Sequence, residues 1–182
     1  MKLQVYGFYL RDKEELQNSS SGGAFTALTD AVFTQNGTVI ACNYDYSERE
    51  MRFCVASDPN TRNQMRGSKY IQAQNDDLYT NLALELNKSN CTPLLIVGTP
   101  CQIAGAKAWI RCKHIKTNRE IIYCDLICHG VSRPQMWKTY LCSQIEKFQD
   151  KITFLTFKDK NKGWLRPTAI AVLESGRRIE IE

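Results

Sequence analysis

Two cysteines, Cys101 and Cys128, stand directly after short apolar segments of the sequence. Cys101 follows the run at 93–97 and falls in the first turn of a helix predicted to continue to residue 111, whereas Cys128 follows the run at 120–127. Apolar runs of this length are typical of buried parallel strands, and ligands of open α/β sheets gather at the carboxyl ends of such strands. If the two strands are neighbours, both thiols face the same crevice.

A thiolate in such a place has two chemical uses. The partial positive charge of a helix N-terminus favours the ionised thiol of Cys101, which can then act as a nucleophile or bind iron. As a nucleophile it lacks an identifiable base, because only assumption places His129 beside it. The alternative is that Cys101 and Cys128 are ordinary packed cysteines, since free cysteine is readily buried.

Three loops contain the small and cationic residues that bind phosphate groups. They are SSGG at 20–23, RGSKY at 66–70 and GTP at 98–100. Small residues let the backbone approach a ligand, and free amides at a helix start bind anions. None of the loops fits the patterns GxxxxGKS/T or GxGxxG, which argues against an ordinary nucleoside triphosphatase and a Rossmann fingerprint. Each loop alone is a weak signal, but three in one short domain favour an anionic ligand.

The other cysteines are predicted to be ordinary residues of a reduced core. The sequence has eight cysteines and no CxxC pair, which argues against a zinc ribbon, a zinc finger and a thioredoxin motif. Cys124 lies about 13 Å before Cys128 along an extended strand, which is too far for one cluster unless the strand breaks between them. Cys124 is assigned to the core and Cys42 and Cys54 to packing across a hairpin, whereas no role is assigned to Cys91, Cys112 and Cys142.

Composition limits the class of protein. The chain has 182 residues, a hydrophobic fraction of 43% and a formal net charge of +5, which is too small to indicate nucleic acid. It contains no apolar run near the ~20 residues of a membrane span and no cleavable apolar leader. We therefore expect a single cytoplasmic domain without a nucleic-acid partner or a membrane span.

The order of predicted elements indicates an α/β fold with a mixed, partly parallel sheet flanked by helices and an antiparallel C-terminal strand segment. Leu78, Leu82 and Leu86 repeat along one helical face, as do Trp137 and Leu141. Strands are predicted at 2–10, at 37–44 and 51–57 as a hairpin, and at 93–97, 120–127, 151–158, 168–174 and 177–182. Helices are predicted at 24–35, through the three leucines to residue 86 with Asn75 or Asp76 as the cap, from Pro100 to residue 111 with Thr99 as the N-cap, and at 134–148. The last segment still alternates where the sequence stops, so we expect a domain truncated at its C-terminus.

Five ordered motifs resemble those of a known family. They are SSSGGAFT (19–26), RGSKY (66–70), GTPCQIAG (98–105), DLICHGVS (125–132) and FKDKNKGW (157–164). In this order they resemble the coenzyme F420 hydrogenase/dehydrogenase beta-subunit family, and more closely its bacterial branch found beside polysaccharide-synthesis genes. The combination of GTPCQ with a later CHG is specific, whereas SGG and GSKY are weak signals alone.

The resemblance implies an iron–sulfur flavoprotein: a single FAD-binding-type domain over 1–182. FAD would pass electrons between a 4Fe-4S cluster and a hydride carrier or substrate, with coenzyme F420 as one candidate carrier and a redox partner protein or ferredoxin-like domain as partner. Cys101 and Cys128 would be cluster ligands. The residues that would bind cofactor are Ser21, Gly22, Gly23, Thr26, Gly67, Ser68, Lys69, Tyr70, Gly98, Thr99, Pro100 and Gln102.

The sequence departs from that family in its cysteines. Members usually carry a ferredoxin-like segment with CxxC repeats before this region and a further CxxC-type pair after it, and neither is present here. A cubane cluster takes four ligands, so the two unassigned ligands are expected outside this chain. The alternative function is a non-catalytic partial domain that binds a flavin-like ligand or a redox partner.

Overall fold

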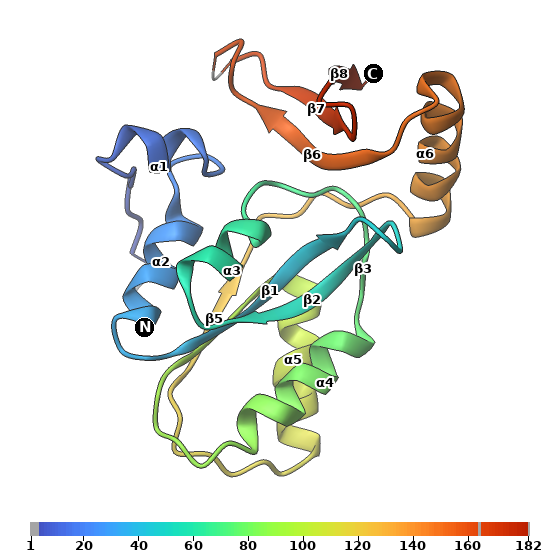
Figure 1. Ribbon diagram of the computed structural model, residues 1–182. Coiled ribbons are helices and arrows are strands. Elements are labelled where there is room, and N and C mark those ends of the chain that lie inside the picture. The colour runs from blue at the N-terminus through green and yellow to red at the C-terminus, as the bar shows by residue number, and fades with distance from the viewer. Residues whose placement is uncertain (1–3, 164, 182) are drawn as a thin grey trace.

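The computed structural model describes residues 4–163 and 165–181 and shows a mixed five-stranded sheet with the strand order β3-β2-β1-β4-β5 (Figure 1). Strands β1, β4 and β5 run parallel, β2 is antiparallel to β1, and β3 is parallel to β2. The strands are β1 (Thr38–Asp45), β2 (Glu50–Ala56), β3 (Ala73–Gln74), β4 (Leu94–Gly98) and β5 (Ile121–Asp125). The predicted hairpin and the two predicted parallel strands are therefore confirmed.

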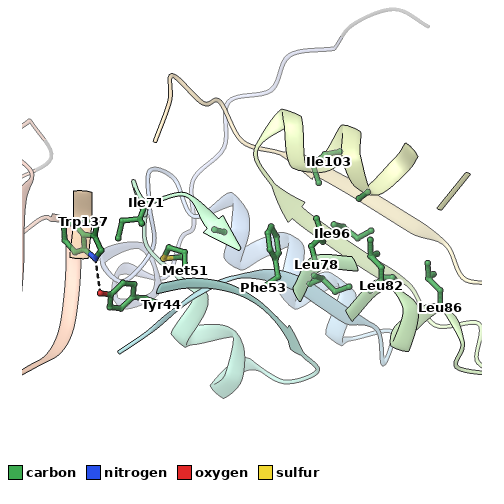
Figure 2. Packing of buried hydrophobic residues seen from close by; sticks show 14 of the residues in the cluster. Tyr44, Met51, Phe53, Ile71, Leu78, Leu82, Leu86, Ile96, Ile103 and Trp137 are labelled. Carbon is green, nitrogen blue, oxygen red and sulfur yellow. Dashed lines mark hydrogen bonds between the residues drawn. The ribbon is translucent and has the colours of Figure 1, made fainter. Parts of the chain in front are cut away.

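Helices cover both faces of this sheet. Val32 of α2 and Met65 of α3 pack with Val39 and Leu95 on one face. The other face carries the larger core, in which the leucines of α4 and Ile103 of α5 pack against the strands (Figure 2). The helices are α2 (Ala24–Phe33), α3 (Pro59–Met65), α4 (Asp76–Leu86) and α5 (Pro100–Cys112). The sheet is thus the middle layer of three, because each of its faces is apolar.

A second sheet follows the first along the chain. Helix α6 (Pro134–Phe148) leads into the antiparallel strands β6 (Ile152–Asp159), β7 (Thr168–Leu173) and β8 (Arg178–Ile181). Trp137 of α6 is buried in the larger core, and its indole N–H donates to the hydroxyl of Tyr44 at 3.0 Å (Figure 2). Aromatic contacts therefore attach the C-terminal segment to the end of β1.

The structure corrects three of the sequence-based assignments. Residues 4–10 form no strand, and a short helix α1 (Lys13–Gln17) follows them. Helix α3 lies in a segment that carries no helical periodicity, and Asp58 caps it by accepting from the amide of Thr61 at 3.0 Å. Strand β5 stops at Asp125, and it is only half-buried because it is the edge strand of its sheet. Residues 2, 3, 164 and 182 of the predicted strands and motifs lie outside the described residues.

A buried ion pair ties the helices to the sheet at the amino ends of β1 and β4. The guanidinium of Arg119, whose side chain is fully buried, lies 3.0 Å from the carboxylate of Glu85 on α4. It also donates to the hydroxyl of Thr38 at 2.8 Å and to the carbonyl of Thr92 at 2.8 Å. Although burial raises the pKa of Glu85, hydrogen bonds from Lys88, Arg119 and Thr38 hold it below its ordinary value.

Candidate functional site

The strands that precede the two motif cysteines are neighbours. In the parallel pairing of β4 with β5, Gly98 lies opposite Asp125, and the amide of Leu126 donates to the carbonyl of Gly98 at 2.9 Å. Cys101 and Cys128 therefore follow the same, carboxyl edge of the sheet, and both are exposed. The two strands are thus neighbours, which is the condition under which the sequence predicts that both thiols face the same crevice.

Each thiol has one local hydrogen-bond partner. Cys101 Sγ lies 3.2 Å from the hydroxyl of Thr99, and Cys128 Sγ accepts from the amide of Gly130 at 3.4 Å. Within residues 4–163 and 165–181, no group of three or more His, Cys, Asp or Glu side chains is placed to hold a metal ion. The assignment of Cys101 and Cys128 as metal ligands stays a prediction.

Helix α5 begins with a capping box. Thr99 is the N-cap and Pro100 the first helical residue, as predicted, while the side chain of Gln102 accepts from the amide of Thr99 at 2.9 Å. Gln102 also donates to Asn75 at 3.4 Å. Gly98 is buried, and a Cβ atom added to it would lie 3.1 Å from Gln102 Oε1. These residues fix the turn that presents Cys101, and their role toward a cofactor stays a prediction.

Backbone hydrogen bonds join the RGSKY loop to the segment after Cys128. The amide and the hydroxyl of Ser132 donate to the carbonyl of Tyr70 at 2.9 and 3.0 Å, and the amide of Gln72 donates to the carbonyl of Ser132 at 3.0 Å. Ile71 and Ser132 form an isolated parallel bridge. Two motifs far apart in the sequence are thereby held side by side.

The SSSGG loop touches the same region through Ser20, whose hydroxyl lies 3.1 Å from that of Ser68. Ser21 is exposed with a positive φ of 47°. The space beside Gly22 and Gly23 is taken by the chain itself, because a Cβ at Gly22 would lie 2.2 Å from the carbonyl oxygen of Phe8. The first loop therefore accommodates the chain's own N-terminal segment.

Thr26 is buried, at 1% exposure, and is fully engaged. Its hydroxyl lies 2.7 Å from that of Ser19, and its carbonyl accepts from Arg62 at 3.2 Å. Arg62 is itself 3% exposed and is paired with Asp30 at 3.1 Å. Burial and the nearby charge of Arg66 lower the pKa of Arg62.

Lys69 closes its own loop. Its ammonium donates to the carbonyls of Met65 and Arg66 at 2.7 Å and to that of Gly67 at 3.2 Å. Burial lowers the pKa of Lys69 to about 8. Gly67 has a φ of +87°, which glycine adopts at no steric cost.

A cavity of about 590 Å³, called the main cavity below, opens beside this loop. Its wall combines the end of β1, α3 with the loop after it, and strand β6. The lining residues are Asn18, Asn43, Tyr44, Tyr46, Asn63, Gln64, Arg66, Gly67, Ser68, Lys69, Phe154, Leu155 and Thr156. Of the sequence-predicted residues, Gly67, Ser68 and Lys69 line the main cavity. The sequence did not identify the Asn and Gln side chains or the β6 residues of this wall as site residues, because they belong to no motif.

The fifth motif completes the assembly. The ring of Phe157 meets that of Tyr70 edge-on at 5.7 Å, and the ammonium of Lys158 lies 5.5 Å from the centre of the Tyr70 ring. Lys160 donates to the carbonyl of Leu16 at 2.8 Å and also to that of Ser19. The described residues of all five motifs thus gather around the carboxyl edge of the main sheet.

These features define an α/β domain whose motif loops meet at the carboxyl edge of a parallel strand pair, where ligands of open sheets bind. Residues 91–178, from before β4 to the start of β8, match the family described as the C terminus of the coenzyme F420 hydrogenase/dehydrogenase beta subunit. The match covers just under half of this chain, and over these residues it confirms the resemblance seen in the motifs.

A solved structure shares the fold. A chain of the F420-reducing NiFe hydrogenase complex from Methanosarcina barkeri, in its xenon-derivatised form, is 14% identical to this chain and superposes with a TM-score of 0.59. The similarity covers 95% of this chain and 58% of that one, so this chain spans little more than half the length of its structural relative. A comparison with curated proteins gives no match.

Proposed function

We propose that this chain is the flavin-binding domain of an oxidoreductase, in which FAD lies in the main cavity. The observation that carries the proposal is the position of that cavity, with the RGSKY loop in its wall, in a chain whose residues 91–178 match the F420 hydrogenase/dehydrogenase beta-subunit family. Its volume of about 590 Å³ falls within the range of about 300–1,000 Å³ typical of ligand pockets.

The residues of the cavity wall fit a flavin nucleotide. Arg66 carries a positive charge, and its buried Nε has no hydrogen-bond partner among the described residues, so a further acceptor fits there. The rings of Tyr44, Tyr46 and Phe154 supply flat apolar surface for an aromatic ring system. The amides of Asn18, Asn43, Asn63 and Gln64 offer donors and acceptors for polar groups.

FAD, when bound, supplies hydride exchange with a carrier and single-electron exchange with an iron–sulfur centre. The chain supplies position and surroundings. Tyr44 is fixed by the indole of Trp137, and the hydroxyl of Tyr46 accepts from the amide of Leu155 at 3.0 Å. Burial raises the pKa of Tyr44 to about 12, so its hydroxyl stays protonated at neutral pH.

The iron–sulfur part of the proposal concerns a site that this chain does not complete. Cys101 and Cys128 follow one sheet edge and are exposed, so both are accessible to a metal centre. The described residues supply no third ligand, whereas a 4Fe-4S cluster takes four. We propose that a longer parent chain, a ferredoxin-like domain or a redox partner protein brings the others.

Further parts of the proposal concern the surroundings of the domain. The structural relative lies in a hydrogenase complex, which supports a redox partner protein and a hydride carrier such as coenzyme F420 for this chain. Within the described residues, no helix combines the length and apolarity that crossing a membrane requires. We propose a cytoplasmic location.

Flavin and iron analysis of the purified chain and of its longer parent tests the proposal. We expect yellow protein with FAD released on denaturation, and iron in the parent that is lost on Cys101→Ser and on Cys128→Ser. Cys91→Ser, which also removes an exposed thiol, is the matched control. Flavin binding without reduction by any hydride carrier would favour the non-catalytic partial domain, and a parent with neither flavin nor iron would overturn the proposal.

A further inference from the structure

We propose that Arg66 anchors the anionic group of the ligand in the main cavity, and that Glu15 of helix α1 occupies this arginine until the ligand displaces it. The inference rests on the proposed function, because it concerns the same cavity. It selects Arg66 from the two cations of the RGSKY loop and adds an internal competitor, Glu15, which lies outside all of the sequence-predicted motifs.

Arg66 is buried, and its guanidinium group does not have a hydrogen-bond partner for every donor. Its side chain is only 7% exposed, and it belongs to the wall of the main cavity. One of its guanidinium nitrogens, Nη2, pairs with the carboxylate of Glu15. Its Nε finds no hydrogen-bond partner among the described residues. A buried N–H without an acceptor is costly, so a ligand that brings one gains from this site.

The neighbouring cations do not share this property. Lys69, the cation that the motif resemblance selects, donates to three backbone carbonyls of its own loop. Arg62 is satisfied by Thr26, Thr29 and Asp30. Lys69 and Arg62 therefore hold the fold, and Arg66 is the cation of this wall that keeps an unused donor. A planar guanidinium also binds phosphate through two parallel hydrogen bonds, which an ammonium does not.

Glu15 is suited to be displaced. Its side chain is 41% exposed, so water solvates the carboxylate once it leaves the arginine. Helix α1 has five residues, and none of these described residues is buried. The helix keeps its place when the pair opens, because Asp12 caps it and Lys160 holds the carbonyl of Leu16 at 2.8 Å. Exchange of one anion for another at Arg66 therefore needs no rearrangement of the core.

The two states compete, and this sets a direction for each substitution. A ligand anion binds only the fraction of molecules in which Arg66 is released, which lowers its apparent affinity. Removing the charge of Glu15 raises this fraction, whereas removing Arg66 removes the anchor. Both effects depend on a phosphate group in the ligand and vanish for a ligand without one.

The test is a fluorescence titration of the chain with FAD, FMN and riboflavin, of which only riboflavin lacks phosphate. Arg66→Gln is expected to weaken FAD and FMN binding by about tenfold or more and to leave riboflavin binding unchanged. Glu15→Gln is expected to tighten FAD and FMN binding severalfold. Glu14→Gln, which removes a charge from the same helix, is the matched control and is expected to change nothing.

The outcomes separate this inference from the proposed function. Inorganic pyrophosphate, titrated by calorimetry, tests the anion site in the absence of a flavin ring. If the wild-type chain binds pyrophosphate through Arg66 but binds no flavin, the proposed function fails and the inference holds. Equal losses for riboflavin and FAD in Arg66→Gln, or unchanged FAD affinity in Glu15→Gln, would overturn the inference.

Discussion

The amide and the hydroxyl of Ser132 both donate to the carbonyl oxygen of Tyr70, over 2.9 and 3.0 Å. Sixty-two residues separate the two in the sequence. Through this contact the segment that follows Cys128 is fixed to the loop that contributes Gly67 and Lys69 to the main cavity. The proposed cluster side and the proposed flavin side of the site thus share one backbone junction.

Ser132→Ala tests this junction. The amide bond to Tyr70 remains, but the hydroxyl bond is lost, so we expect the free energy of unfolding to fall by about 0.5–1.5 kcal/mol and flavin affinity to weaken. Urea unfolding and flavin titration measure both. Ser143→Ala is the control, because its hydroxyl donates to the carbonyl of Tyr140 within helix α6. A loss of flavin affinity as large in the control would contradict the assigned role of Ser132.

Gly22→Ala tests which partner requires the small residue in the first motif. The added Cβ would lie 2.2 Å from the backbone oxygen of Phe8, which cannot rotate away, so the segment around Phe8 must shift. We expect a loss of about 1–3 kcal/mol in the absence of any ligand, measured by urea unfolding, together with faster proteolysis at residues 4–10. Gly7→Ala is the control, since no described atom lies within 4 Å of its Cβ position. A stable Gly22→Ala variant that only loses flavin would instead assign Gly22 to the ligand.

The eight cysteines are expected to divide by reactivity. Burial raises the pKa of Cys42 to about 12 and also raises the pKa of Cys54 and of Cys124, so their thiols remain protonated and slow at pH 8. The exposed cysteines react faster with iodoacetamide, and mass spectrometry of timed samples gives the rates. The exposed set is Cys91, Cys101, Cys112, Cys128 and Cys142. Alkylation of Cys42 as fast as that of Cys91 would contradict the packing described for β1.

Arg119→Met probes the buried ion pair with Glu85. Removing one partner leaves a buried carboxylate, which costs about 3–5 kcal/mol, whereas Arg178→Met breaks a half-exposed pair and costs about 0–1 kcal/mol. The lowered pKa of Glu85 stabilises the fold above its ordinary value of 4.5, and this contribution is lost as the pH falls through the lower folded-state pKa. Unfolding measured from pH 7 to pH 3 should therefore show a smaller acid-side loss in Arg119→Met than in the wild type. Equal costs for the two arginine variants would contradict the assignment.

The sequence alone determined much of the main sheet and its helices. The continuous apolar run at 93–97 predicts strand β4, and the spacing of the leucines predicts helix α4. Thr99 and Pro100 mark the start of α5. The sequence placed Cys101 and Cys128 after the carboxyl ends of two parallel strands, and the pairing of β4 with β5 showed that these strands are neighbours. These features are local, so their residue types and spacing are sufficient to identify them.

Only the tertiary structure decided which groups of the site remain available to a ligand. Both Lys69 and Arg66 belong to the RGSKY motif. The ammonium of Lys69 donates to backbone carbonyls, whereas the Nε of Arg66 has no hydrogen-bond partner among the described residues. Gly22 is small because Phe8 passes close to it. Such contacts join residues distant in the sequence, and no local pattern encodes hydrogen bonds across that separation. The physical reason is that a polar group's availability depends on all its neighbours in the fold, which the sequence order does not specify.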